Sequence, residues 1–204
     1  MLLLFRAFVL ILVAVSVVGW TTLTAINGYS VSKVRERAAS LAGLAQYDQS
    51  WKALETELKR NPKSAELWSD LGQTYRAAWY LHDAGLTTAP AKLLREPDLW
   101  FNHSKDWLFN HALSAYKEAA RLNRLSAMPW YEMGRLLSLA EHHSEADAAF
   151  EQALKRDPHN PGFIVDRAKA LERAGHTEAA LAAFRKAEEI LPNQESESAE
   201  ERLK

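Results

Sequence analysis

Histidine side chains are the groups of this sequence that most readily suggest metal binding or proton transfer. Among the seven histidines of the 204-residue chain, the closest groupings are His103 with His111 and the adjacent pair His142 and His143. Neighbouring residues on a helix diverge by about 100°, so His142 and His143 cannot easily share one ion on regular helix. The sequence has no H-E-x-x-H pattern and no carboxylate cluster with ligand spacing. We therefore predict no metal site and no cofactor.

Catalytic motifs are also missing. The sequence contains no G-x-S-x-G motif, no phosphate-binding loop and no dinucleotide fingerprint. It has no cysteine, which excludes disulfides, thiolate metal sites and cysteine catalysis. Its formal net charge of −1 argues against nucleic-acid binding, which usually needs a basic stripe. We predict a protein that is not an enzyme and does not bind nucleic acid.

Aromatic residues gather in one stretch, residues 80–107, and Trp100, Phe101 and Trp107 are its candidate contact residues. Aromatic clusters of this kind are candidate anchors for a partner protein or a membrane surface. The alternative is that the three rings fold back on the rest of the chain as a local core. Both interpretations fit the sequence.

The N-terminal segment is apolar: residues 7–26 contain no charge. As a helix, twenty residues are roughly 30 Å long, about the thickness of the hydrocarbon core of a bilayer. Arg6 flanks one end, while Trp20 and Tyr29 suit the opposite interface. We expect a single uncleaved span in the inner (plasma) membrane, with the following chain in the periplasm. A cleaved signal peptide is the alternative.

A period of 34 residues organises the rest of the chain. Small, aromatic, small and proline residues recur in this order at Ala146, Phe150, Ala153 and Pro158, then at Ala180, Phe184, Ala187 and Pro192. The segment AELWSDLGQTY (residues 65–75) holds the pattern W-x-x-L-G-x-x-Y, and PWYEMGRLL (residues 129–137) echoes it. Small residues let paired helices approach, bulky ones fill the space between layers, and proline ends a helix. Stacked helical hairpins of this kind form a solenoid.

The pattern resembles the tetratricopeptide repeat family, in which each 34-residue unit is a pair of antiparallel helices. The resemblance implies an all-α helical-hairpin solenoid over residues 31–192, with about four units, preceded by a membrane anchor and its interface (residues 1–30). We expect a polar, disordered tail over residues 193–204. The second unit carries about 28 extra residues near 80–107. We expect its first helix to continue to about His82 and its second to start around Ser104.

Tetratricopeptide domains bind extended peptides in a concave groove lined by the first helix of each unit. When the repeats of this sequence are aligned with the family pattern, the groove positions fall on Gln73, Arg76, Tyr131, Arg135, Lys169 and Arg173. Arginine forms forked bonds with carboxylates, which favours acidic peptides, whereas ordinary solvated charge is the alternative. The carboxylate clamp of chaperone-binding members is not matched, because Ala39 stands at a clamp position.

The anchor and the resemblance together predict a membrane-anchored, non-catalytic scaffold of bacterial type that binds and organises other membrane or envelope proteins. Polysaccharide biosynthesis or export is the envelope assembly that we favour. One alternative is a structural accessory subunit of a membrane complex, as in cytochrome maturation, held by the span and the aromatic insertion. Another is a carbohydrate-binding or enzymatic envelope protein. The oligomeric state does not follow from the sequence.

Overall fold

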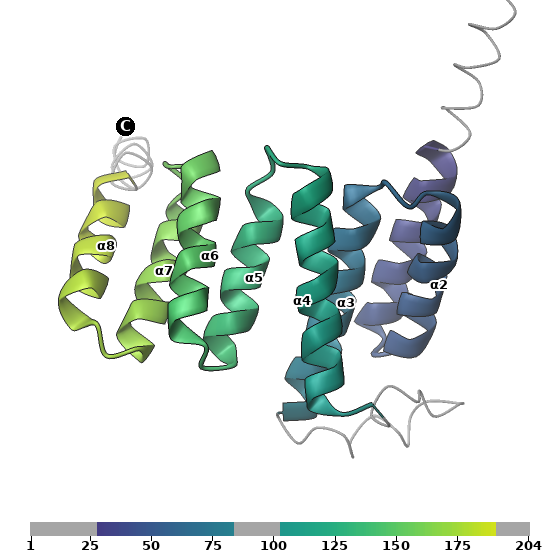
Figure 1. Ribbon diagram of the computed structural model, residues 1–204, viewed down its shortest axis with the longest axis horizontal. Coiled ribbons are helices and arrows are strands. Elements are labelled where there is room, and N and C mark those ends of the chain that lie inside the picture. Colours follow the sequence, from purple (N-terminus) through teal and green to yellow (C-terminus); the bar gives the residue numbers. More distant parts are fainter. Residues whose placement is uncertain (1–27, 84–102, 191–204) are drawn as a thin grey trace, which may run out of the picture.

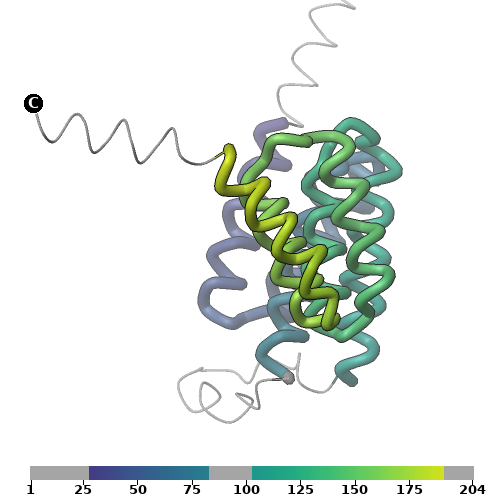
Figure 2. Tube along the Cα trace, turned by 90° about the vertical axis from the view of Figure 1, so that its left-hand side faces the viewer, coloured from purple at the N-terminus to yellow at the C-terminus, as the bar shows by residue number. Residues whose placement is uncertain are grey.

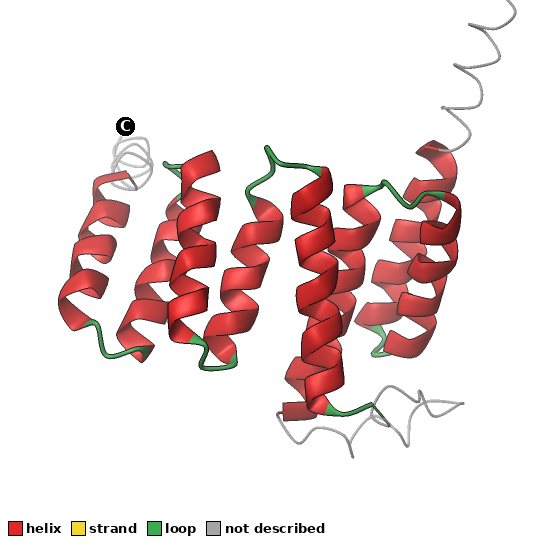
Figure 3. Cartoon of the chain, viewed as in Figure 1, coloured by secondary structure: helices red, strands yellow, loops and turns green. Residues whose placement is uncertain are grey.

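The computed structural model of the protein describes residues 28–83 and 103–190, and every regular element in these ranges is helical (Figure 3). The first helix comprises residues 28–43. The others are α2 (Tyr47–Arg60), α3 (Ala65–Asp83), α4 (Lys105–Leu122), α5 (Met128–Leu139), α6 (His143–Arg156), α7 (Pro161–Arg173) and α8 (Thr177–Ile190).

The helices pack as consecutive hairpins that stand side by side in a row (Figure 1). The most extensive contacts join α3 to α4, α5 to α6 and α7 to α8. Helix 28–43 pairs with α2, where Ser50 Oγ donates to Ala38 O at 2.8 Å. In Figure 1, α4 and α6 lie nearer the viewer, with α3 and α7 behind them, and Figure 2 views the row from the α8 end. We call the side formed by helix 28–43, α3, α5 and α7 the first-helix face, and the side formed by α2, α4, α6 and α8 the second-helix face. The predicted all-α solenoid is confirmed.

Three of the four hairpins turn through one residue with positive φ: Ala45 (59°), Glu141 (63°) and Gly175 (78°). In each turn, an amide just beyond that residue donates to a carbonyl five residues earlier, as in His142 N to Leu137 O at 2.9 Å. This left-handed closure is a common way to end a helix. The second hairpin has residues 84–102 at this place instead, so the insertion interrupts the turn of its unit.

Each of the two middle hairpins brings its helices together at a glycine. A Cβ on Gly72 would lie 2.7 Å from the ring of Tyr116, and a Cβ on Gly134 would lie 2.9 Å from the ring of Phe150. Both rings are almost completely buried. The expected pairing of a small residue with a bulky one is therefore the contact that joins α3 to α4 and α5 to α6.

Helix ends follow the local signals. The second helices α2 and α6 end two residues before Pro62 and Pro158, as the proline spacing predicts. The α3 helix ends at Asp83 and α4 begins at Lys105, one residue beyond each expected boundary. Ser104 caps α4 by accepting a hydrogen bond from the Trp107 amide at 3.1 Å.

The predicted membrane span (residues 7–26) and the polar tail (residues 193–204) lie outside the described residues. Within residues 28–83 and 103–190, no helix is both long enough and apolar enough to cross a membrane.

Candidate partner-binding face

The six residues predicted to line the groove all lie on first helices. Gln73 and Arg76 are on α3, Tyr131 and Arg135 on α5, and Lys169 and Arg173 on α7. The structure links several of them through carboxylates that the prediction did not include.

A chain of ion pairs crosses the first-helix face from α3 to α7, and we call its five members, Arg76, Glu132, Arg135, Asp166 and Lys169, the charge ladder. Arg76 Nε lies 3.4 Å from Glu132 Oε2, and Arg135 Nη1 lies 3.5 Å from Glu132 Oε1. Arg135 Nε lies 3.6 Å from Asp166 Oδ2, and Lys169 Nζ lies 3.6 Å from Asp166 Oδ1. The two carboxylates therefore offset half of the four positive charges among the predicted groove residues.

Glu132 is the buried centre of the ladder, with 7% of its side chain exposed against 20% for Arg76. Arg76 also donates from Nε to the hydroxyl of Tyr116 at 3.3 Å. Burial lowers the pKa of Arg76, but Tyr116 and Glu132 raise it by more, so the guanidinium stays charged. Burial likewise raises the pKa of Tyr116 above its usual range. Arg76 is therefore held in this part of the face by an ion pair to Glu132 and a hydrogen bond to Tyr116.

Tyr131 joins the same network from α5. Its hydroxyl donates to Asp166 Oδ2 at 2.7 Å, and its ring stacks on Phe163 with centroids 4.4 Å apart. Burial and the Asp166 bond raise the pKa of Tyr131 to about 12. Tyr131 thus holds α5 against α7.

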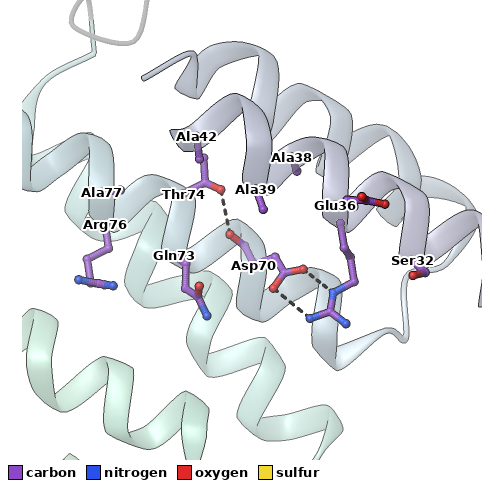
Figure 4. Close-up of a pocket in the computed structure, with 11 residues that line it drawn as sticks. Ser32, Glu36, Ala38, Ala39, Ala42, Asp70, Gln73, Thr74, Arg76 and Ala77 are labelled. Atoms are coloured by element: carbon purple, nitrogen blue, oxygen red, sulfur yellow. Dashed lines mark hydrogen bonds and ion pairs between the residues drawn. The ribbon is translucent and has the colours of Figure 1, made fainter. Parts of the chain in front are cut away.

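A pocket opens at the N-terminal end of the first-helix face, between helix 28–43 and α3 (Figure 4). Its volume is about 570 Å³. Ala38, Ala39 and Ala42 line one wall, while Gln73 and Thr74 lie on the opposite helix (Figure 4). We call this space the Ala39 pocket.

Polar groups line the rim of the Ala39 pocket. The guanidinium of Arg35 pairs with Asp70, which ties helix 28–43 to α3. Within the described part of the chain, Glu36 and Gln73 make no hydrogen bond or ion pair. The pocket therefore combines an apolar wall with two polar side chains available to a ligand.

A family model of the tetratricopeptide repeat matches residues 137–202. The match covers about a third of the 204-residue chain. No curated protein matches the chain.

Solved structures resemble this chain at low sequence identity. A monomeric mutant of IFIT1, solved with Gppp-AAAA, has a TM-score of 0.62 at 16% identity, over 78% of this chain and 34% of that chain. MamA has a TM-score of 0.40 at 20% identity, over 80% of this chain and 92% of its own. A thermophilic TPR protein of Thermus thermophilus, TTC0263, has a TM-score of 0.43 at 21% identity, over 81% and 93% of the two chains. The chain has the helical solenoid fold of tetratricopeptide repeat proteins.

The carboxylates of the first-helix face follow the tetratricopeptide period. Glu132 and Asp166 are 34 residues apart, and Asp70 precedes Glu132 by one unit plus the insertion. Glu36 occupies the same position in the first unit, 34 residues before Asp70. A search of each repeat position for its charge, and not only for its size, would have found this row.

The aromatic insertion of the second unit is described only at its end. Trp100 and Phe101 lie outside the described residues, whereas Trp107 lies in α4 and is half-buried. The Trp107 indole stacks between His103 and His111, with ring centroids 3.9 and 3.7 Å away. It also meets Trp51 of α2 at 5.9 Å. This arrangement is a local aromatic core, and a partner-binding role for Trp107 stays a prediction.

The histidine groupings do not assemble a ligand set. His103 and His111 sandwich Trp107, and His142 faces the ring of Phe109 at 5.4 Å. In the part of the chain that the structure describes, no three histidine or carboxylate side chains converge as metal ligands would.

Proposed function

We propose that this protein is a non-catalytic scaffold that binds partner proteins at the first-helix face of its tetratricopeptide solenoid. The Ala39 pocket carries this proposal, because an apolar wall beside unbonded polar groups fits a peptide with mixed side chains. The charge ladder supports it further: a first-helix face whose helices are tied together presents a preformed surface.

The scaffold is proposed to work at a membrane. Residues 7–26 form the single span, and the solenoid lies on the periplasmic side. Anchoring would raise the local concentration of the solenoid near its partners, so that weak contacts suffice. We expect these partners to be membrane or envelope proteins, with those of polysaccharide synthesis or export as the first to examine.

The groove part of this proposal is tested by filling the Ala39 pocket. Tagged full-length protein is purified from gently solubilised membranes, and the co-purifying proteins are quantified for the original chain and for Ala39→Phe. The matched control is Ala182→Phe, at an exposed position of α8. We expect partner recovery to fall at least tenfold for Ala39→Phe and to stay unchanged for Ala182→Phe. Equal recovery from both variants would contradict binding at this pocket, and no partner at all would contradict the scaffold.

The membrane part is tested separately. We expect the full-length chain to remain in the membrane pellet after alkaline extraction, and a chain without residues 1–27 to be released. A C-terminal alkaline phosphatase fusion should be active, since that enzyme folds only outside the cytoplasm. Release of the full-length chain, or an inactive fusion, would contradict the anchor or its orientation respectively.

A further inference from the structure

A second cavity lies on the other side of the solenoid, away from the Ala39 pocket. It has a volume of about 440 Å³, and its walls come from α2, α3 and α4. Leu58, Trp68, Leu71 and Ala115 give it a mostly apolar lining. Figure 1 shows α3 behind the space between α2 and α4. We call this cavity the Trp68 cleft.

The repeat supplies an internal reference for this cleft, because Trp68 and Trp130 occupy the same position in successive units. The Trp68 indole donates from Nε1 to Pro62 O at 3.0 Å. The equivalent carbonyl beside Trp130 belongs to Arg124, and there Arg156 Nε is the donor at 2.8 Å. The guanidinium of Arg156 also lies 5.1 Å from the centroid of the Trp130 ring.

The two tryptophans therefore differ in what covers them. A cation of the chain itself lies over Trp130, which is a favourable cation–π contact. In the unit of Trp68, the position that corresponds to Arg156 is occupied by Leu122, which has no charge. Among the described residues, no cation or aromatic ring stacks on Trp68. Trp68 instead lines an open cleft in which an aromatic or aliphatic side chain would find an apolar surface.

Three lysines lie in or beside the Trp68 cleft, against one lining carboxylate. Lys59 lines the cleft, Lys63 follows Pro62, and Lys117 lies one turn beyond the lining residue Ser114. In residues 28–83 and 103–190, none of these three lysines forms an ion pair. The lining carboxylate, Glu55, already accepts a hydrogen bond from the Tyr75 hydroxyl at 2.7 Å. A ligand at this rim meets unpaired ammonium groups, which favour negative charge.

We infer that the Trp68 cleft binds an acidic peptide segment of a partner protein, with a large apolar side chain in the cleft and neighbouring carboxylates at the lysine rim. The volume is within the range of roughly 300–1,000 Å³ that ligand pockets occupy. This surface is separate from the Ala39 pocket, so the scaffold holds two partners, or two parts of one partner, on opposite faces.

The test uses a displayed library of random 12-residue peptides, selected on the full-length chain in detergent. The most enriched peptides are then synthesised, and their affinity is measured by fluorescence polarisation. We expect these sequences to combine a Phe, Leu or Trp with Asp or Glu. Ser114→Trp, which places a bulky side chain at the mouth of the cleft, should weaken their binding at least tenfold. Ala148→Trp, the same substitution at the equivalent exposed position of α6, should leave it unchanged.

A charge reversal tests the rim. Lys59→Glu should weaken the same peptides at least fivefold, whereas Lys155→Glu at the equivalent position of α6 should have no effect. Ala39→Phe should not change their affinity, which separates this result from the test of the proposed function.

Three outcomes would overturn the inference. Enriched peptides that are basic, or that bind the Ser114→Trp variant as well as the original chain, would place the interaction elsewhere. A selection that enriches nothing would show that the cleft takes no peptide. Binding of dodecanoate that Ser114→Trp abolishes, without any peptide binding, would replace the protein partner by a lipid.

Discussion

The first-helix face has two regions that share a repeat and differ in character. Ala39 and Arg135 occupy the same position in the first and third units, and both point toward the next first helix. At Ala39 the small side chain leaves a pocket of about 570 Å³. At Arg135 the guanidinium pairs with Glu132 and Asp166, and the corresponding pocket is smaller, about 140 Å³. The solenoid thus fixes where a side chain points, and residue type decides whether a wide pocket or a narrow one bridged by ion pairs results.

The largest predicted effect comes from breaking the ladder at its centre. Glu132→Ala leaves Arg76 half-buried without its carboxylate, and removing one partner of a buried pair typically destabilises a protein by about 3 kcal/mol. We expect a loss of this size in the free energy of unfolding, measured by urea denaturation.

The matched control for this change is Glu36→Ala. Glu36 has the same repeat position, but it is exposed at the rim of the Ala39 pocket and unpaired within the described residues. Its removal should change stability by less than about 0.5 kcal/mol. Equal losses at the two sites would mean that the two regions do not differ as described.

A smaller effect is expected from adding one methyl group in each region. Gly72→Ala pushes a Cβ to 2.7 Å from the Tyr116 ring, whereas a Cβ on Gly43 meets nothing within 4 Å. Overpacking should outweigh the gain in helix propensity at Gly72, for a net loss of about 1 kcal/mol. Gly43→Ala should stabilise the protein by about 0.5 kcal/mol. Thermal unfolding of the two variants would show the opposite signs, and a stabilising Gly72→Ala would refute the close contact.

The smallest effect is a pH dependence within the ladder region. Tyrosine ionises near pH 10 when unfolded, whereas the pKa of Tyr131 in the folded chain is about 12. Its contribution is therefore complete below pH 10 and is lost as the pH rises toward 12. Between pH 9 and pH 11, the original chain should lose more stability than Tyr131→Phe in urea denaturation. Identical losses would show that the Asp166 bond does not contribute.

Much of the fold follows from the spacing of a few residue types. The prolines after α2 and α6 mark the helix ends, and the glycines opposite Tyr116 and Phe150 mark the hairpin contacts. The ends of α3 and α4 around the insertion were predictable because the repeat resumes in phase after it. These features depend on local steric effects and on the 34-residue period, and both can be read from the sequence.

The pairing of charges was less predictable. Arg76 and Arg135 were expected on the correct face, but the pairs Arg76–Glu132 and Arg135–Asp166 join neighbouring units, so no local pattern predicts them. Arg135 and Glu132 are three residues apart on α5 and form a local pair. Arg167 is a similar case, since it interrupts the apolar pattern of the fourth unit. Its guanidinium lies 2.6 Å from Asp147 Oδ1 and 3.2 Å from Glu151 Oε1 of α6, which holds two units together. Such contacts depend on the distance between units, which the sequence does not state.

The charge ladder also has a mechanical consequence. Successive first helices touch, α3 with α5 and α5 with α7, and the ladder joins the same helices by ion pairs. In the described part of the chain, the second helices α2, α4, α6 and α8 make no comparable contact with one another. The solenoid is therefore stiff against stretching along its first-helix face and compliant along its second-helix face. Pulling on its two ends should separate the second helices while the first helices keep their spacing. Added salt should screen the ion pairs and so weaken the resistance of the first-helix face to stretching.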